Sequence, residues 1–523
     1  MTNRCSHVCF AMIAFVVGFA ALAAAQDNRY IVKFHAGRGA AGHAALRAAG
    51  AQVVLSLDPQ NAAAARIPAA ALNGLSRNPN IEYIEADVVR EPYATWSNTS
   101  AGGEVLPYGI QMVQADKVVS PNAGAVTLCI IDSGYSQQHV DLKDGVSFTS
   151  TSGTGTWNKD SCGHGSHVAG TVAADSGNST GVICANPGVS LHIVKVFGND
   201  TLVQDGSCNW TYSSTLVAAL NSCRSAGADV VSMSLGGGAR SRTEEAAFND
   251  ANAHNVLSIA AAGNAGNGST SFPAGYASVM SVAAVDANEV RASFSQKNSD
   301  VEIAAPGVSV LSTTPWLDSN TLATPSATWT GGRIDGAARG SVGGTLVDGG
   351  RCTTSSASWA GKVVLCERGD NSFAQKVSNV QAGGGVAAAV YNLAASDPTC
   401  GVYSGTLGTG VTSPIRAITM SCSDGAAAVA EAGASGTVSS AFLVPNSGYE
   451  AWDGTSMATP HVSAVAALVW SCDLNKTNQQ VRNALTSTAR DKGTAGRDSS
   501  YGYGIVQAAA AAQALGTGSC TIK

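Results

Sequence analysis

Five short apolar segments alternate with helix-like segments between residues 126 and 285. The apolar segments cover residues 126–131, 190–197, 229–235, 256–261 and 279–285, and helical patterns fall at 212–226 and 243–252. Apolar strands separated by helices are typical of a parallel sheet with helices on both faces. The sequence therefore predicts a three-layer α/β fold with a mostly parallel sheet, in which functional groups gather near the carboxyl ends of the strands.

Three glycine-flanked segments carry an aspartate, a histidine and a serine, in that order along the chain. Asp132 ends the first apolar segment in Ile-Asp-Ser-Gly, and His164 lies in Gly-His-Gly-Ser-His-Val-Ala-Gly. Ser456 lies in Gly-Thr-Ser-Met-Ala-Thr-Pro-His, just before an apolar helix expected over 457–470 with Pro460 in its first turn. A serine hydroxyl attacks efficiently only when a positioned base takes its proton and a third group orients that base. The three segments together predict such a triad.

Each segment also has a simpler interpretation. Ser456 could be a plain helix N-cap, and Asp132 could end its strand in a turn. His164 and His167, three residues apart, could bind a metal ion, although no glutamate follows the first histidine as it does in the HExxH zinc motif. Because three separate segments would have to coincide, we favour the triad.

A fourth segment supplies an amide side chain. The apolar segment 256–261 continues into Ala-Gly-Asn-Ala-Gly, which could be an ordinary turn after a strand. Acyl transfer also requires hydrogen-bond donors for the oxyanion of the tetrahedral intermediate. We therefore expect Asn264 to supply one donor, next to the main-chain amide of Ser456.

These four segments resemble the corresponding segments of the subtilisin-like serine proteases, the subtilases. The resemblance implies a serine endopeptidase in which Asp132, His164 and Ser456 hydrolyse peptide bonds of proteins and peptides through an acyl-enzyme. The second hypothesis is a catalytically silent, subtilase-like binding protein. We disfavour it because a silent relative is expected to have lost at least one of these three residues or Asn264, and all four are present.

The same resemblance assigns residues to substrate binding. One edge would pair with the substrate backbone as an added strand, opposite the wall and floor of a pocket. The residues are Ser234, Leu235 and Gly236 for the edge, Ala261, Ala262 and Gly263 for the wall, and Ser271, Phe272 and a cis Pro273 for the floor. None of these positions is acidic. We therefore expect a preference for large apolar or aromatic residues immediately before the cut, rather than for lysine or arginine.

A structural calcium site is also implied by the resemblance. Asp141 follows Asp132 at the family's spacing, and the loop 175–182, which is one residue longer than the family's, would surround the ion with oxygen atoms. The expected ligands are Glu104, Asp141, Asp175, Asn178, Thr180 and Val182. A plain surface loop is the alternative, and no catalytic cofactor is expected.

The N-terminal region is expected to be removed in two steps. Arg4 precedes an apolar stretch over 8–25 that ends in three alanines, which is typical of a secretory signal peptide over residues 1–25. A retained membrane anchor is the alternative. Residues 26–103 resemble the inhibitory α+β propeptide of subtilases, with strand-like ends at 29–34 and 81–87 around alanine-rich helical stretches and a polar linker after 91. We expect a secreted, extracellular enzyme whose propeptide inhibits it until the enzyme cuts its own chain between Tyr93 and Glu104.

The catalytic region is expected to be interrupted by an insert. Residues 104–315 and 445–523 carry the catalytic motifs, and residues 316–444 separate them. Within the insert, 361–369 and 373–392 predict a strand, an amphipathic helix and another strand, in the order of the protease-associated domains that the insert resembles. The insert shows no candidate nucleophile or acid–base cluster. We therefore expect a β-rich module that binds substrates or restricts their access.

Charge and cysteine content fit an exported protein. The net charge of −6 argues against nucleic acid as a partner, and no later segment is apolar enough to span a membrane once the signal is removed. A monomer is expected. Of 13 cysteines, Cys5 and Cys9 lie in the signal, and Cys129, inside the first apolar segment, is expected to be a buried free thiol. The other ten predict five disulfides within three regions. These regions contain Cys162, Cys184, Cys208 and Cys223, then Cys352, Cys366, Cys400 and Cys422, then Cys472 and Cys520.

Overall fold

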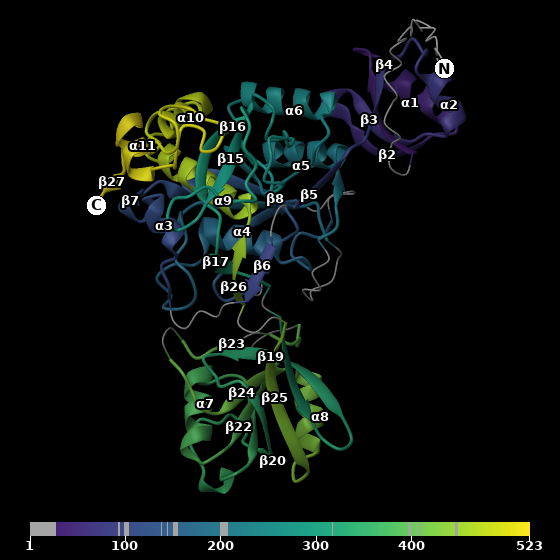
Figure 1. Ribbon diagram of the computed structural model, residues 1–523. Helices are drawn as coiled ribbons and strands as arrows, with labels where there is room; N and C mark the ends of the chain where they lie inside the picture. The colour runs from purple at the N-terminus through teal and green to yellow at the C-terminus, as the bar shows by residue number, and fades with distance from the viewer. Residues whose placement is uncertain are drawn as a thin grey trace, which may run out of the picture. The chain divides into compact units, whose positions relative to one another are not determined.

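The chain forms two compact units, residues 1–87 and residues 88–523 (Figure 1). The computed structural model describes residues 28–92, 95–98, 104–137, 139–143, 145–149, 155–198, 208–315, 317–395, 399–403, 405–408, 411–444 and 448–523. The expected signal peptide lies outside these ranges. Within them, no helix has both the length and the apolar character needed to cross a bilayer.

The first unit is an antiparallel sheet with two helices. Its elements are β1 (Arg29–Phe34), α1 (Gly39–Ala48), β2 (Gln52–Leu57), the short 3₁₀ turn Asp58–Gln60, β3 (Ala62–Arg66), α2 (Ala69–Leu75) and β4 (Ile81–Ala86). The strands lie in the order β2-β3-β1-β4. Val32 and Phe34 of β1 pack with Leu46 of α1 in its core. The two strand-like ends expected from the sequence are β1 and β4, which pair with each other.

One expectation for this unit is wrong. The alanines at 62–65 lie in a stretch that the composition assigned to helix, yet they form β3. Alanine favours helices, but this run pairs with β1 on one side and β2 on the other, and its side chains are at most 1% exposed. A central place in the sheet therefore outweighs local propensity. Close packing also explains Gly42 of α1, where a Cβ would lie 2.2 Å from the Phe34 ring.

The second unit is built on a parallel sheet, as predicted. Its strands are β8 (Thr127–Asp132), β9 (Ser147–Thr149), β10 (Ser190–Lys195), β12 (Val230–Met233), β14 (Leu257–Ala261), β15 (Val279–Val285) and β16 (Val301–Pro306). They form a 7-stranded sheet in the order β16-β15-β14-β12-β8-β10-β9, and every neighbouring pair is parallel. The five strands expected from the sequence are β8, β10, β12, β14 and β15.

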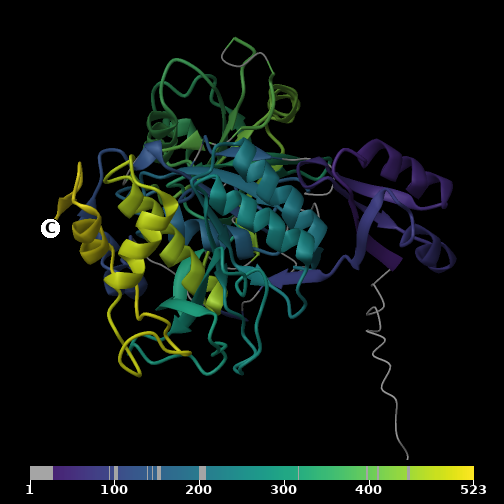
Figure 2. The ribbon, with the colours of Figure 1, turned by 90° about the horizontal axis from the view of Figure 1, so that it is seen from above.

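Helices cover both faces of this sheet. On one face, α9 (Thr455–Trp470) packs on five of the strands, with α4 (His164–Ala173) beside it. On the other, α5 (Ser213–Ser225) and α6 (Arg242–Ala253) lie side by side (Figures 1 and 2). Alternate residues of a strand point to opposite faces. In β8, accordingly, Leu128 belongs to the core around α9, whereas Cys129 is bonded to Cys223 of α5.

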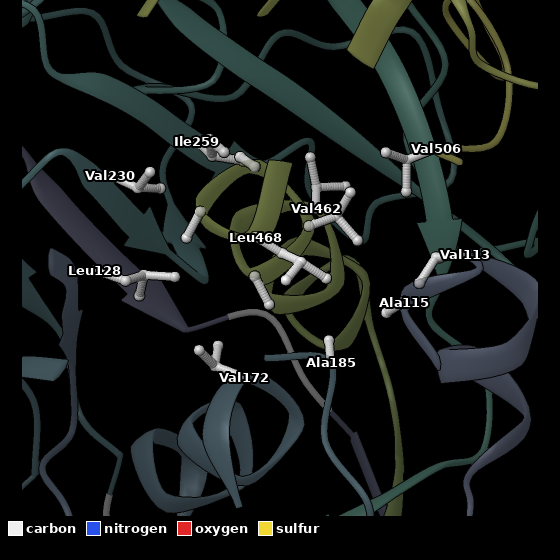
Figure 3. Packing of buried hydrophobic residues seen from close by; sticks show 14 of the residues in the cluster. Val113, Ala115, Leu128, Val172, Ala185, Val230, Ile259, Val462, Leu468 and Val506 are labelled. Carbon is white, nitrogen blue, oxygen red and sulfur yellow. The ribbon is translucent and has the colours of Figure 1, made fainter. Parts of the chain in front are cut away.

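The main apolar core lies between α9 and the sheet. Figure 3 shows Val462 and Leu468 of α9 among Leu128, Val230 and Ile259, which come from three different strands. All 16 residues of α9 are buried. Because the helix is buried on every side, its packing against the strands sets the position of its first turn.

Residues 317–444 form a sheet of their own. Its elements are β18 (Leu317–Ala323), β19 (Thr328–Asp335), β20 (Gly340–Asp348), β21 (Val363–Glu367), α7 (Phe373–Ala382), β22 (Ala387–Tyr391), β23 (Gly405–Thr406), β24 (Arg416–Met420), α8 (Cys422–Ala430) and β25 (Ser435–Val444). The 8-stranded order is β18-β25-β20-β21-β22-β24-β19-β23. The strand, helix and strand expected within the insert are β21, α7 and β22. Apolar clusters on the two faces of this sheet, one including Trp359 and the other Leu346, give the insert cores of its own.

Two small sheets incorporate the segment that follows the first unit. They are β11-β5-β13, from Thr211–Tyr212, Val89–Pro92 and Leu235–Gly236, and β17-β26-β6, from Val310–Thr313, Tyr449–Asp453 and Thr95–Asn98. Thr313 pairs with Tyr449, so the chain enters and leaves the insert at neighbouring positions. Residues of the expected linker thus pair with strands of the second unit. The remaining helices and strands are α3 (Tyr108–Met112), β7 (Val118–Val119), α10 (Asn478–Ser487), α11 (Ala508–Leu515) and β27 (Thr521–Ile522), with short 3₁₀ turns at Ala115–Lys117, Ala123–Ala125 and Ala357–Trp359.

The described cysteines form five disulfides, the number predicted. They join Cys129 to Cys223, Cys162 to Cys208, Cys352 to Cys366, Cys400 to Cys422 and Cys472 to Cys520. The expectation of a free thiol at Cys129 is wrong, because its side chain points to the face of the sheet that α5 covers. The free cysteine is Cys184, whose burial raises its pKa to about 11.

Removing the Cys129–Cys223 bridge should destabilise the second unit. The bridge joins residues 94 positions apart, and chain-entropy arguments give about 4 to 5 kcal/mol for a loop of that size. We expect Cys129→Ala/Cys223→Ala to lower the Tm strongly in calorimetry. Cys184→Ala is the control, because it removes a buried thiol that forms no disulfide. Equal Tm values for the double variant and this control would contradict the prediction.

Candidate active site

Asp132 and His164 form a buried pair at the carboxyl end of β8. Asp132 is the last residue of that strand, and His164 is the first residue of α4, after Gly163 in a left-handed conformation (φ 82°). His164 Nδ1 lies 2.7 Å from Asp132 Oδ1, to which the main-chain N–H of Ser133 also donates at 2.7 Å. An ionised carboxylate only accepts, so Nδ1 carries the proton and Nε2 presents its lone pair. The pair thus selects the tautomer that a general base requires.

A second carboxylate, which the sequence analysis did not single out, joins the segments that carry this pair. Asp160 is 2% exposed. It accepts Ser133 Oγ at 2.7 Å, the N–H of Gly163 at 2.8 Å, and both the N–H and Oγ of Ser166 at 2.8 and 2.6 Å. Ser133 follows the aspartate of the pair, and Gly163 and Ser166 flank its histidine. Asp160 therefore helps to position both Asp132 and His164. In the sequence, its location four residues before His164 is a signal for this positioning role.

Ser456 is held beside Ser234. Ser456 is the second residue of α9 and is buried. Its Oγ donates to the main-chain oxygen of Ser234 at 2.8 Å, and Ser234 Oγ donates to the main-chain oxygen of Ser456 at 2.7 Å. His164 Nε2 makes no hydrogen bond with the residues that the structure describes. For Ser456 to act as the expected nucleophile, its hydroxyl would have to leave the Ser234 oxygen and donate to Nε2.

Pro460 lies inside α9, which corrects the expectation that it sits in the first turn. The helix begins at Thr455, earlier than the sequence pattern indicated. In an α-helix, residue 460 would donate its N–H to the carbonyl of residue 456, and proline has no N–H. Ser234 Oγ donates to that carbonyl instead. The proline thus leaves the backbone oxygen of Ser456 open to its contact with Ser234.

Thr455 fixes the side chain of Asn264. The Oδ1 atom of Asn264 accepts the main-chain N–H of Thr455 at 3.0 Å and its Oγ1 at 2.8 Å. The N–H can only donate, which assigns Oδ1 to that side of the amide and turns Nδ2 away from Thr455. Nδ2 is therefore the end of the amide that can donate to an oxyanion formed next to Ser456.

His167 is tied to the main chain rather than paired with His164. Its Nε2 lies 3.0 Å from the oxygen of Val310 and 3.1 Å from that of Glu450, and its ring stacks on Trp452 at 4.6 Å. Burial lowers the pKa of His167 to about 3. No group of three or more His, Cys, Asp or Glu side chains in the described ranges could hold a metal ion. The alternative of a two-histidine metal site therefore has no support.

The edge expected to bind substrate is paired with a strand of the chain itself. β13 pairs antiparallel with β5, with Leu235 opposite Pro92 and Gly236 opposite Glu91. On its other side β5 pairs with β11, where Arg90 faces Thr211. Residues 89–92 therefore occupy the position that we expected for a substrate strand.

The residues expected to line the pocket lie near this edge. Ala261 and Ala262 are buried at the end of β14, and Gly263 donates its N–H to Thr455 Oγ1 at 3.2 Å, beside the nucleophile. Gly237 and Phe272 exchange two main-chain hydrogen bonds of 2.9 and 2.8 Å, which places the segment from Ser271 next to β13. Ser271 is buried, and the Phe272–Pro273 peptide is cis, as expected from the resemblance.

Hydrogen bonds link several of the expected calcium ligands, and the side chain of Asp141 is at their centre. Asp141 is fully buried, and its Oδ1 accepts Asn178 Nδ2 at 2.9 Å while its Oδ2 accepts the N–H of Val182 at 2.8 Å. Thr180 donates its N–H to Asn178 Oδ1 at 2.8 Å. Val182 thus turns its N–H, rather than its carbonyl oxygen, toward Asp141.

The charges around Asp141 favour a cation. The pKa of Asp141 is raised to about 7, chiefly by burial and to a lesser extent by the nearby acids Asp175 and Glu104. Asp175 donates its N–H to the main-chain oxygen of Asp141 at 3.0 Å, and Glu104 accepts the N–H of Gly177. Oxygen-rich, negatively charged surroundings of this kind suit calcium. The residues present therefore fit a calcium ion in charge and in donor type.

Comparison with known proteins identifies the family. The chain matches the sequence model of the subtilase family over residues 123–339 and 374–504. It is 43% identical over 220 residues to "Subtilisin DY" of Bacillus licheniformis, a match that covers 40% of this chain and 76% of that relative. It is 36% identical over 263 residues to "Subtilisin E" of Bacillus subtilis (strain 168), a match that covers 49% of this chain and 64% of that relative.

Two solved structures are similar to this one. The psychrophilic subtilisin-like protease Apa1 from the Antarctic psychrotroph Pseudoalteromonas sp. AS-11 has a TM-score of 0.50 and 38% identity, over 78% of this chain and 97% of that one. Fervidolysin from Fervidobacterium pennivorans has a TM-score of 0.59 and 20% identity, over 94% of this chain and 61% of that one, and at this identity it shows the fold alone. The predicted three-layer α/β, subtilisin-like fold is confirmed.

Asn264→Asp tests the oxyanion role of this residue. The aspartate keeps an acceptor for the two Thr455 bonds and the shape of the amide, but it replaces the Nδ2 donor by an oxygen. We expect kcat for a chromogenic peptide to fall by about 10²–10³, which is the loss that removal of one oxyanion donor causes in subtilisin, with little change in KM. Asn267→Asp, an exposed change in the same loop, should leave kcat within about twofold. An effect of Asn264→Asp on KM alone would contradict the assignment.

Proposed function

The chain belongs to the subtilase family of subtilisin-like serine endopeptidases, and we propose that it is a secreted member made as a zymogen that processes itself. The observation that carries the proposal is the buried bond between His164 Nδ1 and Asp132, which leaves Nε2 ready to accept a proton. A catalytically silent binding protein, the second hypothesis, would have no need of the tautomer that this bond selects. The insert, which resembles a protease-associated domain, would guide or restrict long substrates.

In the proposed reaction, His164 Nε2 takes the proton of Ser456 Oγ as the hydroxyl attacks the scissile carbonyl. Asp132 stabilises the imidazolium that forms. Asn264 Nδ2 and the N–H of Ser456 donate to the oxyanion, and the N-terminus of α9 favours its negative charge. His164 then protonates the leaving amine, and it later activates the water that hydrolyses the acyl-enzyme.

The pairing of β5 with β13 supports self-processing. Pro92, the last residue of β5, faces Leu235, which is next to Ser234 in the chain. Ser234 is also the residue that exchanges two hydrogen bonds with Ser456. The end of β5 therefore lies one register position from the residue that holds Ser456 Oγ, which supports a cut shortly after Pro92.

The pairing of β6 with β26 supports a cut in the same short part of the chain, because β6 begins just after Ala94. Thr95 faces Asp453, which lies just before Ser456 in the chain. Tyr93 and Ala94, which lie outside the described residues, separate Pro92 from Thr95 in the sequence. We propose that the enzyme cuts its own chain between them. An aromatic residue before the cut also agrees with the preference expected from a roomy, uncharged pocket. After the cut, β5 would keep its bonds to β11 and β13, so residues up to Tyr93 would act as an inhibitor within the complex.

Blocking the nucleophile should block both processing and turnover. In a host without other proteases, we expect the secreted product of the unchanged gene to yield a fragment that ends at Tyr93, by intact-mass spectrometry. The mature enzyme should hydrolyse casein and should be labelled at Ser456 by a fluorophosphonate, because that reagent requires an activated serine. Ser456→Ala should accumulate as the uncut precursor and should lack both activities.

Ser463→Ala is the matched control, since Ser463 lies on the same helix and its hydroxyl donates to the main-chain oxygen of Thr459. This variant should process normally. Trimming of Ser456→Ala at the same bond would overturn self-processing, and a first cut elsewhere between 95 and 104 would overturn the register assignment. Absence of both labelling and hydrolysis in the unchanged protein would favour the silent binding protein.

We also propose that Asp141, Asn178 and the oxygen atoms of the loop 175–182 hold a structural calcium ion. The buried carboxylate of Asp141, with Asp175 and Glu104 nearby, supports this proposal because a divalent cation would offset the repulsion between these groups. Flipping the Asn178 amide would turn its Oδ1 toward such an ion. The ion would stabilise the loop and would take no part in the chemical step.

Calcium removal should lower the Tm of the mature enzyme. An ion that binds only the native state stabilises it by about 2.7 kcal/mol at a hundredfold excess over Kd. We expect EDTA to lower the Tm and added calcium to restore it, measured on enzyme inhibited with a fluorophosphonate to prevent autolysis. Asp141→Asn should lose this sensitivity to EDTA, whereas Asp348→Asn, a change in the insert, should retain it. Identical melting curves with EDTA and with calcium would exclude the site.

A further inference from the structure

A buried ion pair joins β5 to α6. Arg90 Nε lies 3.2 Å from Glu244 Oε1, and Arg90 Nη2 lies 2.6 Å from Glu244 Oε2, so the two groups meet through a pair of hydrogen bonds. Both side chains are completely buried. Arg90 Nη1 also donates to the main-chain oxygen of Val89 at 2.8 Å. A two-point contact between guanidinium and carboxylate is directional, and it is stronger than a bond between neutral groups.

Contacts outside β5 hold Glu244 in place. It lies in the first turn of α6, and its N–H donates to Oγ of the capping residue Ser241 at 3.2 Å. Tyr276 accepts the N–H of Ser241 through its hydroxyl and donates the hydroxyl to the carbonyl of Ser241, both at 3.0 Å. None of these bonds involves residues 89–92. Residues outside β5 therefore help to hold the first turn of α6, which carries the carboxylate.

Arg90 occupies a defined position relative to the proposed cut. With Tyr93 before the scissile bond, Arg90 is the fourth residue on that side. β5 pairs with β11 and β13 as an extended substrate would, by strand addition. Gly237 makes room for this side chain, because a Cβ there would lie 3.1 Å from Arg90 Nη1 and 2.4 Å from the Val89 oxygen. A substrate in the same register would place its own fourth residue against Glu244.

We infer that Glu244 forms a binding site for arginine at the fourth residue before the cut, an inference that rests on the proposed function. When residues up to Tyr93 leave, Glu244 loses its two hydrogen bonds to the guanidinium of Arg90. An arginine of the substrate in the same register would restore both of them. Lysine restores the charge but lacks the planar fork of arginine, and alanine restores neither. The enzyme thus prefers substrates that have an aromatic residue immediately before the cleaved peptide bond and an arginine three positions before that residue.

Chromogenic peptides of the form Xaa-Ala-Pro-Phe-p-nitroanilide test the inference on the mature wild-type enzyme. Xaa is arginine, citrulline, lysine or alanine, and citrulline keeps the shape of arginine without its charge. We expect kcat/KM for the arginine peptide to exceed those for alanine and citrulline by at least about tenfold, with lysine in between. The measurement is made at low ionic strength and repeated at high salt, where a contact sheltered from solvent keeps most of its preference.

Two neighbouring glutamates give matched variants. Glu244→Gln should reduce the ratio of kcat/KM for arginine over alanine to about one. Glu245→Gln changes the next residue of the same helix turn, whose carboxylate pairs instead with the exposed Arg240, and should keep the wild-type ratio.

The outcomes separate this inference from the proposed function. Cleavage of the alanine peptide by the wild type, with equal kcat/KM for arginine and citrulline, would overturn the inference and leave the proposed function standing. Failure to cleave any of the four peptides would overturn the proposed function and the inference with it. If Glu244→Gln does not fold, the comparison of arginine with citrulline on the wild type still decides.

Discussion

The burial of α9 is the constraint on which the active site depends. All 16 of its residues are buried, and it packs against five strands of the parallel sheet. A helix in that position cannot shift without disturbing the core shown in Figure 3. Ser456 in its first turn is therefore held near Ser234, and Thr455 holds the amide of Asn264. Pro460 adds to this arrangement because it frees the Ser456 carbonyl for the Ser234 hydroxyl.

Around that helix, buried polar groups hold the side chains of the active site in position as well as contributing to stability. Asp160 joins the segments that flank Asp132 and His164, so a few short hydrogen bonds set the geometry of the pair. The same principle holds at the substrate edge, where main-chain pairing holds β5 and the Arg90–Glu244 contact fixes one side chain. A site that binds an extended substrate strand, such as the edge of β13, can also be occupied by the extended segment β5 of the same chain. Under the proposed function, inhibition by the N-terminal segment and recognition of substrate would therefore have one physical basis.

The parts of the fold that the sequence predicted well are those governed by local pattern. The strands β8, β10, β12, β14 and β15 are continuous apolar runs bounded by turn residues, and such runs are recognisable one at a time. The errors arose where packing decides. Ala62–Arg66 is a strand because β1 and β2 flank it. Cys129 is bridged because its side chain points to the face that α5 covers, and α9 begins at Thr455 because the core holds its first turn.

The sequence by itself determined the parallel α/β architecture and indicated the groups that we propose to react, because apolar runs and short glycine-flanked motifs are properties of neighbouring residues. Tertiary structure alone decided which distant groups meet. Arg90 and Glu244 are 154 residues apart, and no sequence motif around either residue predicts that they are in contact. Their pairing exists because β5 is added to β13 in one register and the first turn of α6 faces it. Contacts of that kind depend on how separate elements pack and on which charges burial forces together, and no local pattern of residues encodes them.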